Sequence, residues 1–138
     1  MKAIKIEKFG GPEVLELKDI EIGKPGPKEV LVKNNSIGLN YIDVYHRTGL
    51  YPLELPSGIG LEASGVVEEI GAEVSHFKVG DRVSHASAPI SGYSEKQIMP
   101  EEKLVIVPEG ISDEVASCIL LKGITSEYLL HRSYAAKK

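Results

Sequence analysis

Cysteine is almost absent from this chain of 138 residues, in which Cys118 is the only one. A single thiol cannot close an internal disulfide, so we expect a reducing compartment, the cytoplasm. Basic residues are not in excess either, because the formal net charge is -4, and no nucleic-acid partner is expected. No apolar run approaches the roughly 18 residues that a membrane helix needs, and the first ten residues do not resemble a signal peptide. The composition therefore predicts binding neither to membranes nor to nucleic acid.

A glycine-rich turn of the kind that opens a helix and holds the pyrophosphate of a dinucleotide is also missing. The segment Gly10-Gly11-Pro12 contains a proline, and its spacing is too short for a strand–turn–helix unit. What is present suits one domain, because 42% of the residues are hydrophobic and 26% are charged. We therefore expect a folded domain without a dinucleotide site of its own.

Short alternating or apolar segments bounded by glycine and proline predict strands along most of the chain. The predicted strands are residues 3–7, 14–18, 30–37, 65–70, 82–85, 93–99 and 104–107. The glycines between residues 58 and 80 stand where a strongly bent sheet needs tight corners or close backbone approach. This pattern predicts a mainly β domain, a small and strongly bent barrel, that ends in helices.

Two helical regions are predicted. Asn40 can cap a short helix over residues 41–47 that ends at Gly49. Ser112 can cap a second helix, in which Val115, Ile119 and Leu120 form the apolar face and Cys118 lies on the buried side. We expect Gly123 to break or bend this helix before a further helical stretch over residues 125–132.

Several motifs, in order along the chain, resemble one enzyme family. Residues 60–65 (GLEASG) and 79–83 (VGDRV) resemble the signature of the medium-chain dehydrogenase/reductase superfamily. The quinone oxidoreductase (zeta-crystallin-like) branch is similar in further motifs, at residues 10–15, 38–43, 47–52 and 122–125. The resemblance extends from residue 1 to about residue 134.

The resemblance implies a GroES-like, partly open β-barrel over residues 1–125 and, over residues 126–138, a helical segment leading into a nucleotide-binding domain that this chain does not contain. The intact enzyme would transfer a hydride from NADPH to a small-molecule quinone or enone, and it could be a homodimer. The alternative is a stand-alone interaction module or an inactive remnant. In that case exposed Ile124, Leu129 and Leu130 would promote self-association.

The resemblance also implies that the chain uses no zinc. Zinc enzymes of the superfamily hold the catalytic metal partly with a cysteine and a histidine, and Asn40 and Leu61 occupy the matching positions. A neutral amide is a poor zinc ligand and an aliphatic side chain is none. The four histidines are scattered, which gives no metal-binding spacing of their own. The expected chemistry is therefore direct hydride transfer to an electron-poor substrate.

The resemblance implies five site residues, each of which also has an ordinary structural interpretation. Tyr45 would donate a hydrogen bond to a quinone oxygen, and Tyr51 would stack on a flat ring; Tyr45 could equally be a partly buried aromatic. Asn40, Lys122 and Thr125 would bind the cofactor, although they could be a helix cap, a solvated charge and a helix hydroxyl.

Two acidic residues near these positions are expected to be structural. Glu62 should pair with a buried arginine or with backbone amides rather than react. Asp43 should cap or buttress the turn at Asn40.

Overall fold

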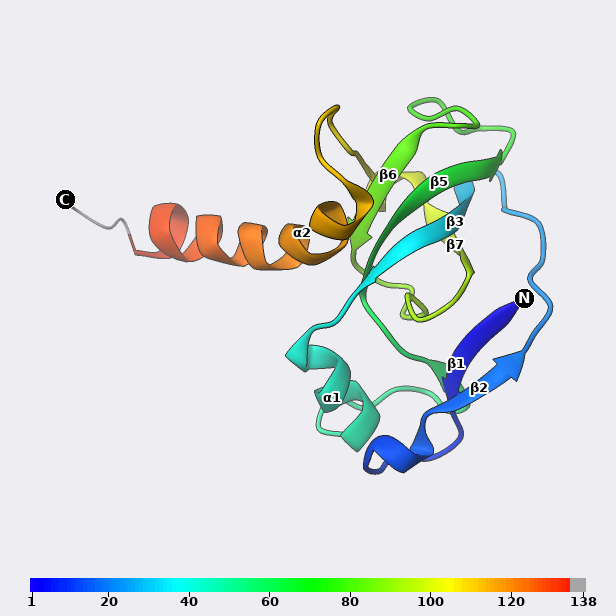
Figure 1. Cartoon of the computed structure of the whole chain (residues 1–138), viewed down its shortest axis with the longest axis vertical. Helices are drawn as coiled ribbons and strands as arrows, with labels where there is room; N and C mark the ends of the chain where they lie inside the picture. Colours follow the sequence, from blue (N-terminus) through cyan, green and yellow to red (C-terminus); the bar gives the residue numbers. More distant parts are fainter. Residues whose placement is uncertain (135–138) are drawn as a thin grey trace.

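The computed structural model describes residues 1–134 and contains two antiparallel sheets with helices at one side (Figure 1). The smaller sheet has the order β2-β1-β4, made of β1 (Lys2–Ile6), β2 (Glu16–Asp19) and β4 (Ser57–Gly58). The larger sheet has the order β7-β3-β5-β6-β8. Its strands are β3 (Glu29–Gly38), β5 (Glu62–Ile70), β6 (Arg82–Ala86), β7 (Lys96–Pro100) and β8 (Val105–Ile106). The predicted mainly β, partly open barrel with a helical exit is confirmed.

The helical elements connect and flank these strands. They are η1 (Pro12–Val14), α1 (Tyr41–Thr48), η2 (Glu101–Lys103), α2 (Asp113–Glu127) and the π-helical turn η3 (Tyr128–Ser133). None of the helices within residues 1–134 combines the length and the apolar character that crossing a membrane would require. Residues 135–138 of the predicted helical segment 126–138 lie outside the described residues.

The core forms where the strands of the large sheet turn their apolar faces inward. One cluster contains Val30, Val32, Val67, Val83, Met99 and Leu104. A second, smaller cluster lies under the small sheet and contains Ile6, Val14 and Ile59. Full burial of each such side chain is worth about 1.5–3 kcal/mol, so each cluster stabilises the sheet against which it packs.

Helix α2 is fixed to the large sheet at its first turns. Ser112 caps it as predicted, since its hydroxyl accepts a hydrogen bond from the Val115 amide at 3.3 Å. Arg82 donates to the Asp113 carboxylate at 2.9 Å and to the Ile111 carbonyl at 2.7 Å. The start of the helix is therefore held on β6.

The packing face of α2 differs from the prediction. Val115 and Ile119 are exposed, and Ala116 and Ser117 are buried in their place. The reason is close approach: a Cβ built on Gly38 would lie 1.8 Å from the Ser117 carbonyl oxygen. A backbone contact this tight is compatible only with small residues on the packing face of the helix.

Two further expectations for this region were wrong. Cys118 is exposed rather than buried, because it lies off the narrow face of small residues. Gly123 does not break the helix, since α2 continues to Glu127 and passes directly into η3. A glycine costs a helix only about 1 kcal/mol, which the hydrogen bonds around it can tolerate. Every residue from Lys122 to Tyr134 is exposed, and the helix projects from the sheets (Figure 1).

Candidate functional site

The candidate site begins where β3 ends and α1 starts. Asn40 occupies the N-cap position of α1, and Gly49 ends the helix in a left-handed conformation with φ of 81°, as predicted. Asp43 accepts a hydrogen bond from the Asn40 backbone amide at 2.9 Å and another from the Tyr93 hydroxyl at 2.9 Å. Burial raises the pKa of that hydroxyl above its usual value, and Asp43 raises it further. The expectation that Asp43 buttresses the Asn40 turn is confirmed.

The Asn40 side chain makes its hydrogen bonds away from the helix it precedes. Its Nδ2 donates to Glu62 Oε2 at 2.8 Å, and its Oδ1 accepts from Lys122 Nζ at 2.7 Å. Glu62 Oε1 accepts from the Leu121 backbone amide at 2.8 Å. We call Asn40, Glu62, Leu121 and Lys122 the carboxylate network; it joins β5, the start of α1 and the middle of α2.

Glu62 is the centre of this network. Its side chain is 0% exposed, and the Lys122 ammonium lies 3.6 Å from its Oε2. A buried carboxylate is tolerated only when hydrogen-bonded and paired, and the network supplies both. The predicted backbone amide partner is therefore confirmed, whereas the predicted buried arginine is wrong: the paired cation is a lysine whose side chain is 54% exposed.

The carboxylate network leaves defined polar groups unused. An amide carries two N–H donors and an oxygen with two lone pairs, and an ammonium carries three donors. Within residues 1–134, one N–H of Asn40 and two N–H groups of Lys122 are therefore without a hydrogen-bond partner. Asn40 is only 6% exposed whereas the Lys122 side chain is 54% exposed, so the accessible donors are those of the positively charged ammonium.

Three tyrosines form a second group on and beside α1, which we call the tyrosine cluster. The rings of Tyr41 and Tyr45 have centroids 5.2 Å apart, and those of Tyr45 and Tyr51 are 5.3 Å apart. The Tyr51 backbone amide donates to the Tyr45 carbonyl at 3.1 Å, which fixes the loop against the helix. Tyr51 is 49% exposed, as its proline-edged loop predicted, so one part of its ring is open to a ligand.

Thr125 lies on α2 one turn beyond Lys122. Its hydroxyl donates to the Leu121 carbonyl at 2.8 Å, as an ordinary helical threonine does. Of the five residues proposed for the site, the structure therefore brings together Asn40 with Lys122 and Tyr45 with Tyr51. The Thr125 hydroxyl makes no hydrogen bond to either of these two pairs.

A shallow groove of about 280 Å³ borders Asn40. Besides Asn40 and Asp43, its lining includes Val44, Arg47, Ile59 and Tyr93. Tyr93 was missed by sequence reasoning, because it lies 50 positions from its partner Asp43 and no motif links the two.

Within residues 1–134, no group of three or more histidine, cysteine, aspartate or glutamate side chains could hold a metal ion. At Asn40, one of the two positions that match zinc ligands of the superfamily, the carboxamide oxygen accepts a hydrogen bond from the Lys122 ammonium, whose positive charge disfavours a cation there.

Comparison with known proteins gives a consistent result. The family model described as the alcohol dehydrogenase GroES-like domain matches residues 26–137. Quinone oxidoreductase from Pseudomonas aeruginosa is 53% identical over 134 residues, which are 96% of this chain and 41% of that protein. A 2-haloacrylate reductase from a Burkholderia species is 41% identical over 141 residues, which cover 98% of this chain and 42% of that protein.

A solved structure shares the fold closely. The crystal structure of Escherichia coli quinone oxidoreductase complexed with NADPH matches with a TM-score of 0.97 at 43% identity. The match covers 99% of this chain and 42% of that one. The chain therefore spans about two fifths of the length of the relatives it matches.

Proposed function

Since the chain belongs to the alcohol dehydrogenase GroES-like domain family, in the quinone oxidoreductase branch of the medium-chain dehydrogenase/reductase superfamily, we propose that it forms the substrate side of an NADPH-dependent reductase. The substrates are quinones or related conjugated carbonyls. The observation that carries the proposal is the Asn40–Lys122 pair beside the start of α1. The buried Glu62 holds this pair in place, and within residues 1–134 both side chains keep N–H groups that make no hydrogen bond.

The residues of this chain fit one edge of NADPH. The unused N–H groups of Lys122 suit a phosphate or ribose oxygen, because a charge-assisted hydrogen bond to an anion is about twice as strong as a neutral one. The unused N–H of Asn40 suits the nicotinamide carboxamide oxygen, and Thr125 lies one turn further along the same helix. When bound, NADPH supplies the hydride; this chain orients it.

The tyrosine cluster serves the substrate. Tyr51 offers a half-exposed ring against which a flat quinone or enone can stack, held in place by its backbone bond to Tyr45. The Tyr45 hydroxyl donates a hydrogen bond to the substrate oxygen as negative charge develops there. The substrate oxygen is polarised by this hydrogen bond, and we propose that zinc takes no part.

The remaining features of the proposal concern the whole protein. Residues 1–125 are the substrate-side domain, and residues 126–138 lead into a nucleotide-binding domain like that of the longer relatives. We propose that the protein acts in the cytoplasm, that its partners are small-molecule substrates, and that it can form a homodimer.

A second function is favoured by one observation. Ile124, Leu129 and Leu130 are all more than half exposed on the projecting part of α2 and on η3. A stand-alone interaction module would use these side chains to bind a partner or a second copy. Light scattering measures whether the chain associates with itself. A chain that is monomeric alone and gains reductase activity when a nucleotide-binding domain completes it would contradict the interaction module.

The proposed function is tested in two stages. Calorimetric titration of the 138-residue chain with NADPH should show no binding in the micromolar range, since most of a phosphate-binding surface is missing. A chimera that joins this chain to the part of the Pseudomonas aeruginosa relative outside the aligned residues should oxidise NADPH in the presence of 1,4-benzoquinone.

The roles of the site residues are then separated by variants of the chimera. Tyr51→Ala should raise the KM for benzoquinone about tenfold, which corresponds to about 1.4 kcal/mol, with little change for NADPH. Lys122→Met should raise the KM for NADPH instead. Val79→Ala, at an exposed loop position, is the matched control. A folded chimera without reductase activity would refute the proposed function.

A further inference from the structure

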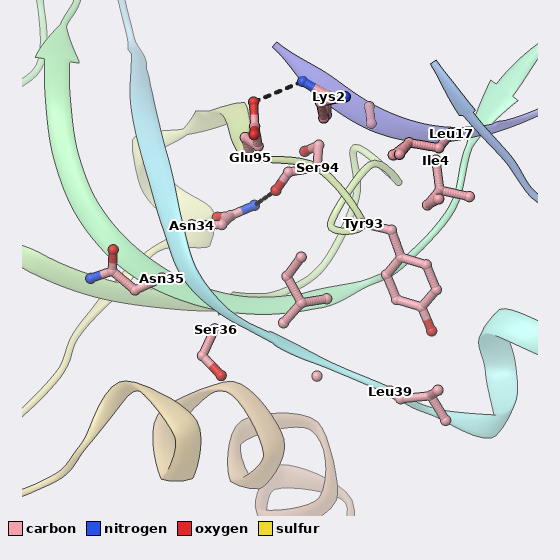
Figure 2. A pocket seen from close by; sticks show the side chains of 13 residues that line it. Lys2, Ile4, Leu17, Asn34, Asn35, Ser36, Leu39, Tyr93, Ser94 and Glu95 are labelled. Atoms are coloured by element: carbon pink, nitrogen blue, oxygen red, sulfur yellow. Dashed lines mark hydrogen bonds between the residues drawn. The ribbon is translucent and has the colours of Figure 1, made fainter. Parts of the chain in front are cut away.

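The loop between β6 and β7 is fixed by side chains of the large sheet. Asn34 on β3 donates from Nδ2 to the Ser94 carbonyl at 2.9 Å, a bond that is drawn in Figure 2. Gln97 on β7 donates from Nε2 to the Pro89 carbonyl at 2.6 Å, and its side chain is buried. The backbone between residues 89 and 94 is therefore held at both ends.

Tyr93 is the residue of this loop that reaches the candidate site. Its backbone amide donates to the Ile59 carbonyl at 2.9 Å, and its carbonyl accepts from the Ile4 amide at 2.8 Å. Its ring packs on the backbone of Gly60, where φ is +94° and an added Cβ would lie 2.2 Å from Tyr93 Cδ1. Figure 2 shows the hydroxyl end of the ring pointing toward the end of β3 near Leu39. Gly60, the first residue of the GLEASG motif, is thus explained by contact with a tyrosine much later in the chain.

The Tyr93 hydroxyl ends at Asp43, a buried carboxylate with few hydrogen bonds. Asp43 is 4% exposed, and within residues 1–134 its Oδ2 accepts from the Tyr93 hydroxyl and from the Asn40 backbone amide, each at 2.9 Å. Its Oδ1 is buried and has no partner in the same range. Because a buried carboxylate needs donors, each of these two bonds restrains where the carboxylate lies. Burial and Asp43 raise the pKa of the Tyr93 hydroxyl, so it remains a donor at neutral pH.

The Asp43 carboxylate links Tyr93 to Asn40. Asn40 is held at two points, since Asp43 accepts its backbone amide and the carboxylate network binds its side chain. The direction of the carboxamide depends on both points, because the side chain extends from the backbone that Asp43 fixes. Loss of one of the two donors to Asp43 would let the carboxylate move, and the N-cap residue of α1 would move with it.

We propose that Tyr93 is a positioning residue of the reductase, which acts through the Asp43 carboxylate to hold Asn40 where its carboxamide meets the nicotinamide. The inference rests on the proposed function, because that function gives Asn40 this role. A small displacement of a group that orients the reacting molecule slows the reaction many-fold. Since Tyr93 itself binds neither substrate nor cofactor, its loss should lower kcat and leave the KM values almost unchanged.

The first test uses the 138-residue chain and needs no reductase activity. Tyr93→Phe removes the hydroxyl and keeps the ring that packs on Gly60. NMR should then show a changed chemical shift at the Asn40 backbone amide and hydrogen exchange there that is about tenfold faster. Exchange at the core amides of Val30 and Val32 reports that the variant is folded. An Asn40 amide with an unchanged shift and exchange rate would overturn the proposal.

The second test uses the chimera described above. Tyr93→Phe should lower kcat for benzoquinone reduction about tenfold, which corresponds to about 1.4 kcal/mol, and should change the two KM values less than about twofold. When Asn40→Ala is already present, Tyr93→Phe should lower kcat no further, because Tyr93 acts through Asn40. The loss of stability caused by Tyr93→Phe should appear in both backgrounds, so that a merely structural role is distinguished from positioning.

Ser84→Ala is the matched control for lost stability. It removes a buried hydroxyl that donates to the Ala63 and Ala116 carbonyls at 3.0 and 3.1 Å, outside the candidate site, and it should leave kcat unchanged. An active chimera in which Tyr93→Phe leaves kcat unchanged, or lowers it equally with and without Asn40→Ala, would contradict the role of Tyr93. A folded chimera without reductase activity would instead refute the proposed function, and the NMR measurement would still decide whether Tyr93 holds Asn40.

Discussion

The buried His85 should make the stability of this chain fall as the pH is lowered from about 6.5, before most carboxylates begin to titrate. The side chain is 0% exposed in β6, opposite Ala63 and next to the Glu62 position. Neither ring nitrogen has a hydrogen-bond partner within residues 1–134. Burial lowers the pKa of His85 to about 4, although the Leu61 backbone and the Glu62 carboxylate act in the opposite direction.

The direction of the effect follows from proton binding. Between pH 6.5 and 4 the unfolded chain protonates this histidine and the folded chain does not, so acid favours the unfolded state. With a pKa of about 4 in the folded state, lowering the pH from 7.5 to 5 should reduce the free energy of unfolding by about 2 kcal/mol. Buried His46, whose pKa is also lowered, mainly by burial, adds a smaller loss in the same direction.

Urea unfolding at a series of pH values, followed by circular dichroism, measures this loss. His85→Leu should be no less stable than the wild type at pH 7.5, because it removes two unpaired buried nitrogens, and it should lose about 2 kcal/mol less on going to pH 5. His131→Gln, on the exposed η3, is the control and should follow the wild type. Parallel pH profiles for the wild type and His85→Leu would refute the reasoning.

Two further changes test the contacts that position the site. Lys122→Met should lower the free energy of unfolding by about 1–2 kcal/mol, which is less than for a fully buried pair because the lysine is half exposed. This loss should disappear when Lys122→Met is combined with Glu62→Gln, because no unpaired carboxylate then remains. Urea unfolding of the single and double variants measures both effects, and additive losses in the double variant would contradict the pairing. Gly38→Ala should cost about 3 kcal/mol or prevent folding, because its Cβ would collide with the Ser117 carbonyl. Thermal unfolding measures this cost against Gly23→Ala, where a Cβ meets nothing, and equal stability of the two variants would contradict the argument from close approach.

Local patterns predicted every strand except β4, and they predicted the caps and the ends of α1, because each depends on residues close together in sequence. The strand bounds were less accurate: β2 begins two residues later than predicted, β5 three residues earlier and β7 three residues later. Ser112 and Gly49 perform the roles that their residue types suggest. Motif resemblance then supplied the barrel topology, which no local pattern contains.

The errors concern contacts between distant segments. The packing face of α2 is set by the approach of its backbone to Gly38, so small residues displaced the apolar ones that periodicity selected, and Cys118 became exposed. The partner of Glu62 depends on where α2 crosses β5, which a single sequence does not reveal. The bonds from Tyr93 to Asp43 and from Lys122 to Asn40 span 50 and 82 positions and had no signal.

The projecting end of α2 extends well beyond the contacts that hold the helix on the sheets. Within residues 1–134, its last hydrogen bonds to the rest of the fold are those of Leu121 and Lys122, and the helical residues beyond them extend roughly 16 Å at 1.5 Å per residue. With the pivot at Glu62, a tilt of about 6° would carry the tip about 2 Å. A contact that tilts the projecting end of α2 would therefore displace Leu121 and Lys122, whose hydrogen bonds to Glu62 and Asn40 orient the Asn40 carboxamide.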